Sequence, residues 1–231
     1  MAHKRKTNTT KLEIIQVASR LFLDHGYSKT TIKSIADELD ISTGHLMFYF
    51  PTKEHLLSVL VHMLCDFQWK TMQTMVEEGN TSLMALCLEL ATMAVMCEED
   101  ETAKDLYLSA YTHPLTLEII RKNDAQRAKL VFAEHCPHWE HHHFVEAEII
   151  VSGIEYTTLM TAGEPVSVDI RIAGALNTIL RTYQVPEETR RMKIQRVLEM
   201  DYRALGRRIL QDFKDYVEET NENAFEELLR R

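Results

Sequence analysis

The feature that most restricts the fold is a pair of short helical segments between residues 30 and 51. Apolar residues recur at helical spacing over residues 32–39, after a Thr30 or Thr31 that suits an N-cap. Residues 40–42 separate them from a second helix, predicted over residues 43–49 with Ser42 as N-cap and ended by Pro51. Two short helices joined in this way predict a helix-turn-helix unit, whose second helix lies in the major groove of DNA.

The second short helix divides into an inner and an outer face. Leu46 and Phe50 are four residues apart and are expected to pack against the preceding helix. Gly44 costs helix stability of about 1 kcal/mol, but it leaves room for the close approach of DNA. The residues that then point outward are Thr43, Gly44, His45, Phe48 and Tyr49.

A small three-helix subdomain with an aromatic core is the alternative interpretation, and protein contact through the same unit is another. Against the first, a helix of about seven residues cannot bury Met47, Phe48, Tyr49 and Phe50 together, because they point around the whole circle. In addition, a first helix is predicted from apolar residues at helical spacing between Leu12 and Phe22, and a basic arm just before it could reach phosphates or a neighbouring groove. The arm consists of Lys4, Arg5 and Lys6.

Charge is distributed unevenly along the chain. The formal net charge is −9, which excludes a protein coated all over in nucleic acid. Residues 1–60 nevertheless hold eight basic and six acidic residues, against 18 basic and 29 acidic residues in the remainder. A slightly basic N-terminal segment followed by an acidic remainder indicates a localised site for a polyanion.

The remaining sequence predicts further helices and no strands. With 7 Gly and 5 Pro in 231 residues the chain is poor in turns, and no stretch alternates as a strand does. We therefore expect an all-α protein with a larger helical part after the helix-turn-helix domain. The predicted helices of that part cover residues 82–97, 101–111, 115–134, 144–162, 168–183 and 187–219.

Neither a membrane span nor a secretory signal is expected from this sequence, since no apolar run approaches the required length. The 4 Cys lack CxxC spacing, so they predict neither a zinc finger nor a disulfide framework. We expect a cytoplasmic protein.

The segment "IIQVASRLFLDHGYSKTTIKSIADELDISTGHLMFYFPTKEHLL" resembles the DNA-binding domain of the TetR family of bacterial transcriptional regulators. The resemblance covers roughly residues 10–60. It implies a DNA-binding domain over residues 1–57 and a ligand-binding and dimerisation domain over residues 58–231. It further implies a regulator, in most members a repressor, that binds a palindromic operator as a dimer and is released by a small molecule. Neither enzymatic activity nor a cofactor is implied.

The resemblance also implies roles for individual residues. Thr31, Tyr49 and Lys53 would contact phosphates, Lys53 together with the amides that begin the helix predicted after Thr52. Thr43, Gly44, His45 and Phe48 would approach base edges. The chain departs from the family at Met47-Phe48, where a pair of tyrosines is common, so a phosphate contact of that pair is absent or is supplied by Tyr49.

Homodimerisation is expected through helices near residues 144–162 and 168–183. Apolar residues cover more than one face of each helix, and Gly153, Ala173 and Gly174 would permit close approach. Burial within one chain explains one such face equally well. The breadth of the apolar surface favours a dimer.

The effector is expected to be apolar or amphipathic, but the sequence assigns no ligand-binding residue. Methionines and tyrosines at helical spacing could line an adaptable pocket or be ordinary core: Met72, Met75, Met84, Met93, Met96, Tyr107, Tyr111 and Tyr156. The operator, the direction of regulation and the role of residues 187–219 do not follow from the sequence.

The His-rich segment 135–143 allows a different function, a metal sensor or a metal-binding helical enzyme. It contains five histidines and Cys136, all of them metal ligands. Consecutive histidines cannot all converge on one ion, and Pro137 indicates a turn between helices. We therefore interpret the segment as a solvated turn and expect no metal site.

Overall fold

The computed structural model describes the backbone of residues 2–162 and 165–228 and the side chains of residues 11–162 and 165–227. Within these residues it is built of helices and contains no strand, so the all-α prediction is confirmed. The helices that form the first end of the molecule are α1 (Ala2–His25), α2 (Ile32–Glu38), α3 (Thr43–Tyr49) and the first part of α4 (Lys53–Glu77). The body consists of the rest of α4 with α5 (Ser82–Glu99), α6 (Glu101–Thr112), α7 (Pro114–Val131), α8 (His141–Met160), α9 (Val168–Thr182), α10 (Glu187–Glu199), α11 (Tyr202–Glu219) and α12 (Glu222–Leu228).

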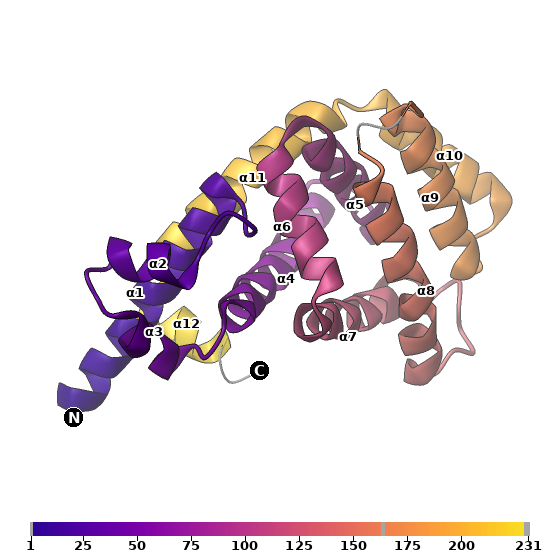
Figure 1. Ribbon diagram of the computed structural model, residues 1–231. Helices are drawn as coiled ribbons and strands as arrows, with labels where there is room; N and C mark the ends of the chain where they lie inside the picture. Colours follow the sequence, from indigo (N-terminus) through magenta and orange to yellow (C-terminus); the bar gives the residue numbers. More distant parts are fainter. Residues whose placement is uncertain (1, 163–164, 229–231) are drawn as a thin grey trace.

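The helix α5 is the centre of the body. Its own apolar residues point in all directions around the helix axis, and nearly every residue from Leu83 to Cys97 is buried. It packs against α4, α6, α8, α9, α10 and α11. A helix that is apolar all round is stable in water only when other helices enclose it. Figure 1 shows α1–α3 at one end of the resulting body and α8–α10 at the other.

Helix ends follow local signals that the sequence carries. Thr81 caps α5 through a hydrogen bond from Met84 N of 3.2 Å, and Asp100 caps α6 through bonds from the backbone amides of Thr102 and Ala103. Gly79, with φ of 93°, makes the left-handed turn after α4.

Several predicted boundaries are corrected. The single helix predicted over residues 187–219 is wrong, because Asp201 begins a new helix by accepting a hydrogen bond from Ala204 N (3.0 Å). The predicted helix over residues 115–134 ends earlier, at Val131, and the one over residues 144–162 begins earlier, at His141. The remaining ends differ by one or two residues.

The last two helices return along the molecule to its first end. α11 packs on α5 and then on α1, and α12 packs on α1 and α4 (Figure 1). Gln16 Nε2 donates to the carbonyls of Glu218 and Thr220, each at 3.2 Å, and Lys214 Nζ lies 2.8 Å from Asp24. The segment whose role was not predicted therefore fastens α1 to the body.

None of the described helices is long and apolar enough to cross a membrane.

Candidate nucleic-acid interface

The turn between α2 and α3 sets the angle of the two short helices. Thr31 begins α2 with a capping box, in which its hydroxyl accepts from Ser34 N (3.0 Å) and the Ser34 hydroxyl accepts from Thr31 N (2.9 Å). After α2, Asp40 takes a left-handed conformation with φ of 52°, and Ile41 N donates to the Ala36 carbonyl at 3.0 Å. Residues 39–42 thus connect the two helices, one residue more than the predicted 40–42.

The inner face of α3 packs as the sequence predicts. Leu46 is fully buried and Phe50 nearly so, within the core that includes Ile35. Ser42 is the N-cap, and its hydroxyl accepts from His45 N at 3.1 Å. The seven-residue helix is therefore fixed at its start by a cap and along one side by two large apolar residues.

The outer face of α3 is open to solvent and partly apolar. Thr43, Gly44 and His45 are exposed, Phe48 is 79% exposed, and Met47 is 48% exposed. Tyr49 is half-buried, and its ring contacts those of Phe48 and His45 edge-on, with centroids 5.2 and 5.3 Å apart. A short helix that exposes so much apolar surface next to polar groups is typical of a binding surface.

Lys53 has an internal role that the sequence did not reveal. Its Nζ donates to the carbonyls of Tyr27 (2.9 Å) and Thr30 (3.0 Å) and lies 3.9 Å from the centre of the Tyr27 ring. Burial lowers the pKa of Lys53, and the neighbouring Glu54 acts against that shift. Lys53 therefore holds the α1–α2 turn against the start of α4, and one of its three N–H groups is left for another acceptor.

The structure places the three basic residues of the predicted arm inside α1. Lys4, Arg5 and Lys6 follow Ala2, where the helix begins, so the expectation that they precede the first helix is wrong. Lysine and arginine are good helix formers, and no proline or glycine interrupts the segment. Their side chains lie outside the described residues.

A second contact joins the α1–α2 turn to the body, and sequence reasoning missed it. The backbone N–H and the hydroxyl of Ser28 donate to the carboxylate of Asp105 in α6, at 2.7 and 2.5 Å. Gly26 has φ of 93°, and a Cβ there would lie 2.8 Å from Asp105 Oδ2. Asp105 lies 79 residues after Gly26 in sequence, so no local pattern indicates this contact.

The predicted dimer helices leave an apolar face uncovered. The exposed fractions along α8 are 55% for Ile149, 60% for Ile150 and 44% for Met160, and Ile170 on α9 is 65% exposed. A Cβ added at Gly153 or Gly174 would meet nothing within 4 Å. We call this surface the α8–α9 face; it consists of Val145, Ile149, Ile150, Gly153, Met160, Ile170 and Gly174.

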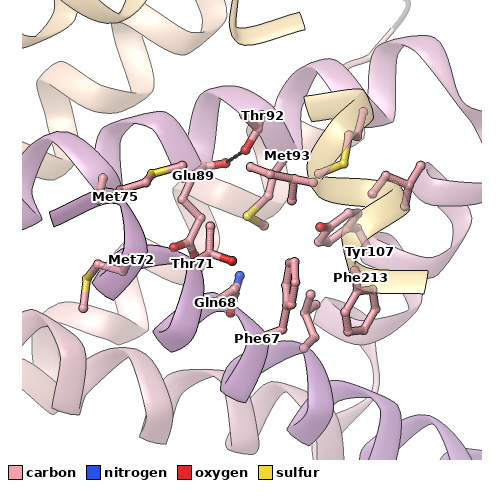
Figure 2. A pocket seen from close by; sticks show the side chains of 15 residues that line it. Phe67, Gln68, Thr71, Met72, Met75, Glu89, Thr92, Met93, Tyr107 and Phe213 are labelled. Atoms are coloured by element: carbon pink, nitrogen blue, oxygen red, sulfur yellow. Dashed lines mark hydrogen bonds between the residues drawn. The ribbon is translucent and has the colours of Figure 1, made fainter. Parts of the chain in front are cut away.

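Two adjoining cavities lie inside the body. The methionine cavity, of about 30 Å³, lies between α4, α5, α6 and α11 and is almost wholly apolar. Figure 2 shows Met72, Met75 and Met93 around it, with Phe67, Tyr107 and Phe213.

The second, the acidic cavity, of about 40 Å³, is enclosed by α4, α5, α6, α7, α8 and α9. Its polar lining includes Glu89, Asp124, Arg127, Glu148, Glu155, Tyr111 and Tyr183. Of the predicted pocket residues, Met84 and Tyr156 line neither cavity.

The His-rich segment forms the start of α8 and the turn before it. His143 Nδ1 accepts from Glu140 N at 3.0 Å, and the His142 and His143 rings lie 3.9 Å apart. Among the residues that the structure describes, no three or more His, Cys, Asp or Glu side chains are arranged to hold a metal ion.

Comparison with known proteins identifies the first end of the molecule. Residues 14–60 match the family model described as "Bacterial regulatory proteins, tetR family". The chain is 28% identical over 106 residues to the HTH-type transcriptional regulator YuxN of Bacillus subtilis (strain 168), covering 46% of this chain and 36% of that protein. It is 28% identical over 74 residues to the HTH-type transcriptional repressor KstR2 of Mycolicibacterium smegmatis, covering 32% and 36%. The chain thus spans little more than a third of the length of either relative, and both are regulators rather than enzymes.

Among solved structures, a gamma-butyrolactone receptor described as an ArpA-like protein aligns over 90% of this chain and 98% of its own. The sequence identity is 19% and the TM-score is 0.42.

Proposed function

We propose that this chain, a TetR family regulator, binds operator DNA as a homodimer and that a small molecule bound in the body releases it. The observation that carries the proposal is the outer face of α3. A capped helix presents Thr43, Gly44 and His45 without a covering element, which is the geometry that a major groove about 12 Å wide can receive. Because its relatives include a repressor, we infer that the chain represses transcription. We further propose that it acts in the cytoplasm.

We propose that residues 1–57 act as the DNA-binding domain and residues 58–231 as the ligand-binding and dimerisation domain. α4 continues through residue 57, so a movement of the body reaches the first end through an unbroken helix. Ser28 and Asp105 supply a second connection between α6 and the α1–α2 turn.

Within the DNA-binding domain the residues divide by the chemistry they offer. Thr43, Gly44, His45 and Phe48 would face base edges. Thr31, Tyr49 and Lys53 would contact phosphates, and Lys4, Arg5 and Lys6 would add positive charge near the backbone of the duplex.

The α8–α9 face supports the homodimer. A single helix-turn-helix reads too few base pairs for useful specificity, and a two-fold dimer doubles the site. Isolated exposed isoleucines need no explanation, but a row of them beside two uncovered glycines is suited to a second copy of the same helices.

Selection of bound duplexes from a random library tests the proposal. We expect enrichment of a palindrome whose half-sites lie one or more helical turns apart. Enrichment of an unpaired half-site would contradict the dimer, and the absence of any enriched sequence would contradict DNA recognition.

Salt dependence tests the phosphate contact of Lys53. Lys53→Ala is expected to lower the slope of log affinity against log salt by about 0.9 and to leave sequence preference unchanged. Because Lys53 also stabilises the α1–α2 turn, the melting temperature of the Lys53→Ala variant is measured alongside. Lys129→Ala, at an exposed position on α7, is the matched control and should leave the slope unchanged. A changed base preference in Lys53→Ala would contradict a phosphate role.

A further inference from the structure

We infer that the acidic cavity binds a protonated amine with a hydrocarbon tail, whose ammonium group is held by Glu148 and Glu155 and whose tail enters the methionine cavity. This inference rests on the proposed function, because it names the class of effector. It begins from the charges inside the body.

The acidic cavity holds more negative than positive groups. Four carboxyl groups and one guanidinium line it. Arg127 is already paired, since Nη1 donates to Glu89 at 2.9 Å, Nη2 donates to the other Glu89 oxygen, and Asp124 lies 3.5 Å away. Glu148, which is buried, and Glu155, which is half-buried, therefore have no cation of their own among the lining residues, and withdrawing carboxyl groups from water without one is costly.

One carboxylate oxygen in this cavity has no partner. Tyr183 donates to Glu148 Oε1, but Glu148 Oε2 is buried without a hydrogen bond, and the residue is only 3% exposed. Tyr111 donates to Glu155 Oε2 at 2.9 Å. A ligand that completes this arrangement must donate hydrogen bonds to carboxylates, and an ammonium group brings three such donors and the missing charge.

The buried donor Arg127 Nε requires only a neutral acceptor. Arg127 Nε is buried without a hydrogen bond, but the charge of the guanidinium is already balanced by Glu89 and Asp124. A hydroxyl, an ether oxygen or a water satisfies that N–H. An anionic ligand would find no unbalanced cation in the cavity, and its charge would be buried without a counter-charge.

Without a bound cation, the pKa values of these carboxyl groups lie above their usual range, which favours the protonated form. Burial raises the pKa of Glu148 to about 8 and that of Asp124 to about 6, and it raises the pKa of Glu155 well above its usual range. A bound ammonium lowers these pKa values again, so binding at pH 7 releases protons and strengthens as the pH rises towards 8. The titratable and charged groups that face Glu148 and Glu155 are Cys65 of α4, Glu89 of α5, Tyr111 of α6, Arg121, Asp124 and Arg127 of α7, and Tyr183 after α9.

Size and surroundings select an amine with a tail. A cavity of about 40 Å³ admits an ammonium group, since a water needs roughly 10–15 Å³. The methionine cavity shares Leu64, Met93 and Tyr107 with it, besides Gln68 and Glu89. Beyond these two polar residues, a chain attached to the ammonium meets apolar, adaptable side chains. A metal ion is disfavoured, because the described His, Cys, Asp and Glu side chains form no set of ligands for it.

Calorimetry with three six-carbon probes tests the charge preference. We expect hexylamine to bind at least tenfold more tightly than 1-hexanol and hexanoate not to bind. Affinity should rise about fourfold for each methylene between propylamine and hexylamine, as expected for burial of the tail. Equal binding of hexylamine and 1-hexanol, or preferential binding of hexanoate, would overturn the inference.

Substitutions on α8 test the residues. Glu148→Gln and Glu155→Gln keep the shape of the side chain and should each lower hexylamine affinity at least tenfold without changing that of 1-hexanol. Glu146→Gln, at an exposed position on the same helix, is the control and should bind hexylamine as the unmodified chain does. Circular dichroism checks that each variant folds, and a folded variant with unchanged amine affinity would contradict the assignment.

Operator binding separates the two proposals. Sequence-specific duplex binding without amine tests the regulator, whereas amine binding without DNA tests the cavity. A chain that binds its operator but no amine refutes the effector class only. A chain that binds hexylamine but no duplex refutes the regulator only. Hexylamine that binds without altering operator affinity refutes its role as effector.

Discussion

The two sides of the body differ in what covers them. On the α11 side, the chain returns to its own beginning, and buried side chains such as Phe213, Val217 and Phe225 fill the space against α1 and α4. On the α8–α9 side nothing in the described chain covers Ile149, Ile150 or Ile170. The helical pattern differs accordingly: apolar residues cover more than one face of α8, whereas α11 buries a single apolar face. One apolar face is thus covered within the chain, and the other is open for the second subunit of the proposed homodimer.

The largest effect is expected from a substitution on the uncovered α8–α9 face. Ile150→Glu places a charge in the centre of the proposed dimer contact, where a buried unpaired carboxylate costs several kcal/mol. We expect a monomer by light scattering and a loss of operator affinity of about a hundredfold or more, because each monomer then binds one half-site.

Val76→Glu is the control for that experiment. Val76 is 40% exposed on α4, away from α8 and α9, and its replacement should leave both the mass and the operator affinity unchanged. A dimer that survives Ile150→Glu would show that the α8–α9 face is not the contact.

The covered side is tested at Phe225, which is 2% exposed where α12 meets α1 and α4. Phe225→Ala removes a large buried ring, and such changes cost about 3 kcal/mol. Chemical unfolding should show that loss, whereas Asn223→Ala, exposed on the same helix, should show almost none. An unchanged free energy of unfolding in Phe225→Ala would mean that α12 does not stabilise the first end.

The sequence predicted local structure better than long-range contacts. Helix α3 was predicted from a cap, a period and a proline, all of which act within a few residues. The contact of Ser28 with Asp105 and the return of α11 to α1 join residues far apart, and no pattern within either segment encodes them. The break at Asp201 was missed because its capping side chain stands in an otherwise helical sequence.

The same limit applies to the candidate sites. The residues of α3 could be named from the sequence, because a short helix between known caps has only one outer face. Glu148 and Glu155 could not, since charged residues on a helix are usually solvated, and only packing by neighbouring helices buries Glu148 and half-buries Glu155.

The outer face of α3 is also uncovered, and a substitution at Gly44 tests it. A Cβ there would meet only Ser42 Oγ, at 4.0 Å, so Gly44→Ala is compatible with the folded chain. Alanine should raise helix stability by up to about 1 kcal/mol, and the free energy of unfolding should rise accordingly. Operator affinity should nevertheless fall about tenfold, because the added methyl group lies between the helix and the bases. Equal affinity for the operator would remove Gly44 from the interface.

The smallest effect is expected at the ion pair on the covered side. Lys214 and Asp24 lie 2.8 Å apart with side chains 30% and 44% exposed, and water and salt screen such pairs. Lys214→Met should therefore cost less than about 1 kcal/mol in the free energy of unfolding, with operator affinity changed less than twofold. Since Gln16 and Phe225 continue to hold α1 against α11 and α12, the contact should survive the loss of one charge. A loss of stability as large as that of Phe225→Ala would show instead that the covered side depends on this ion pair, and the distinction between a side closed by packing and a side left for a partner would then fail.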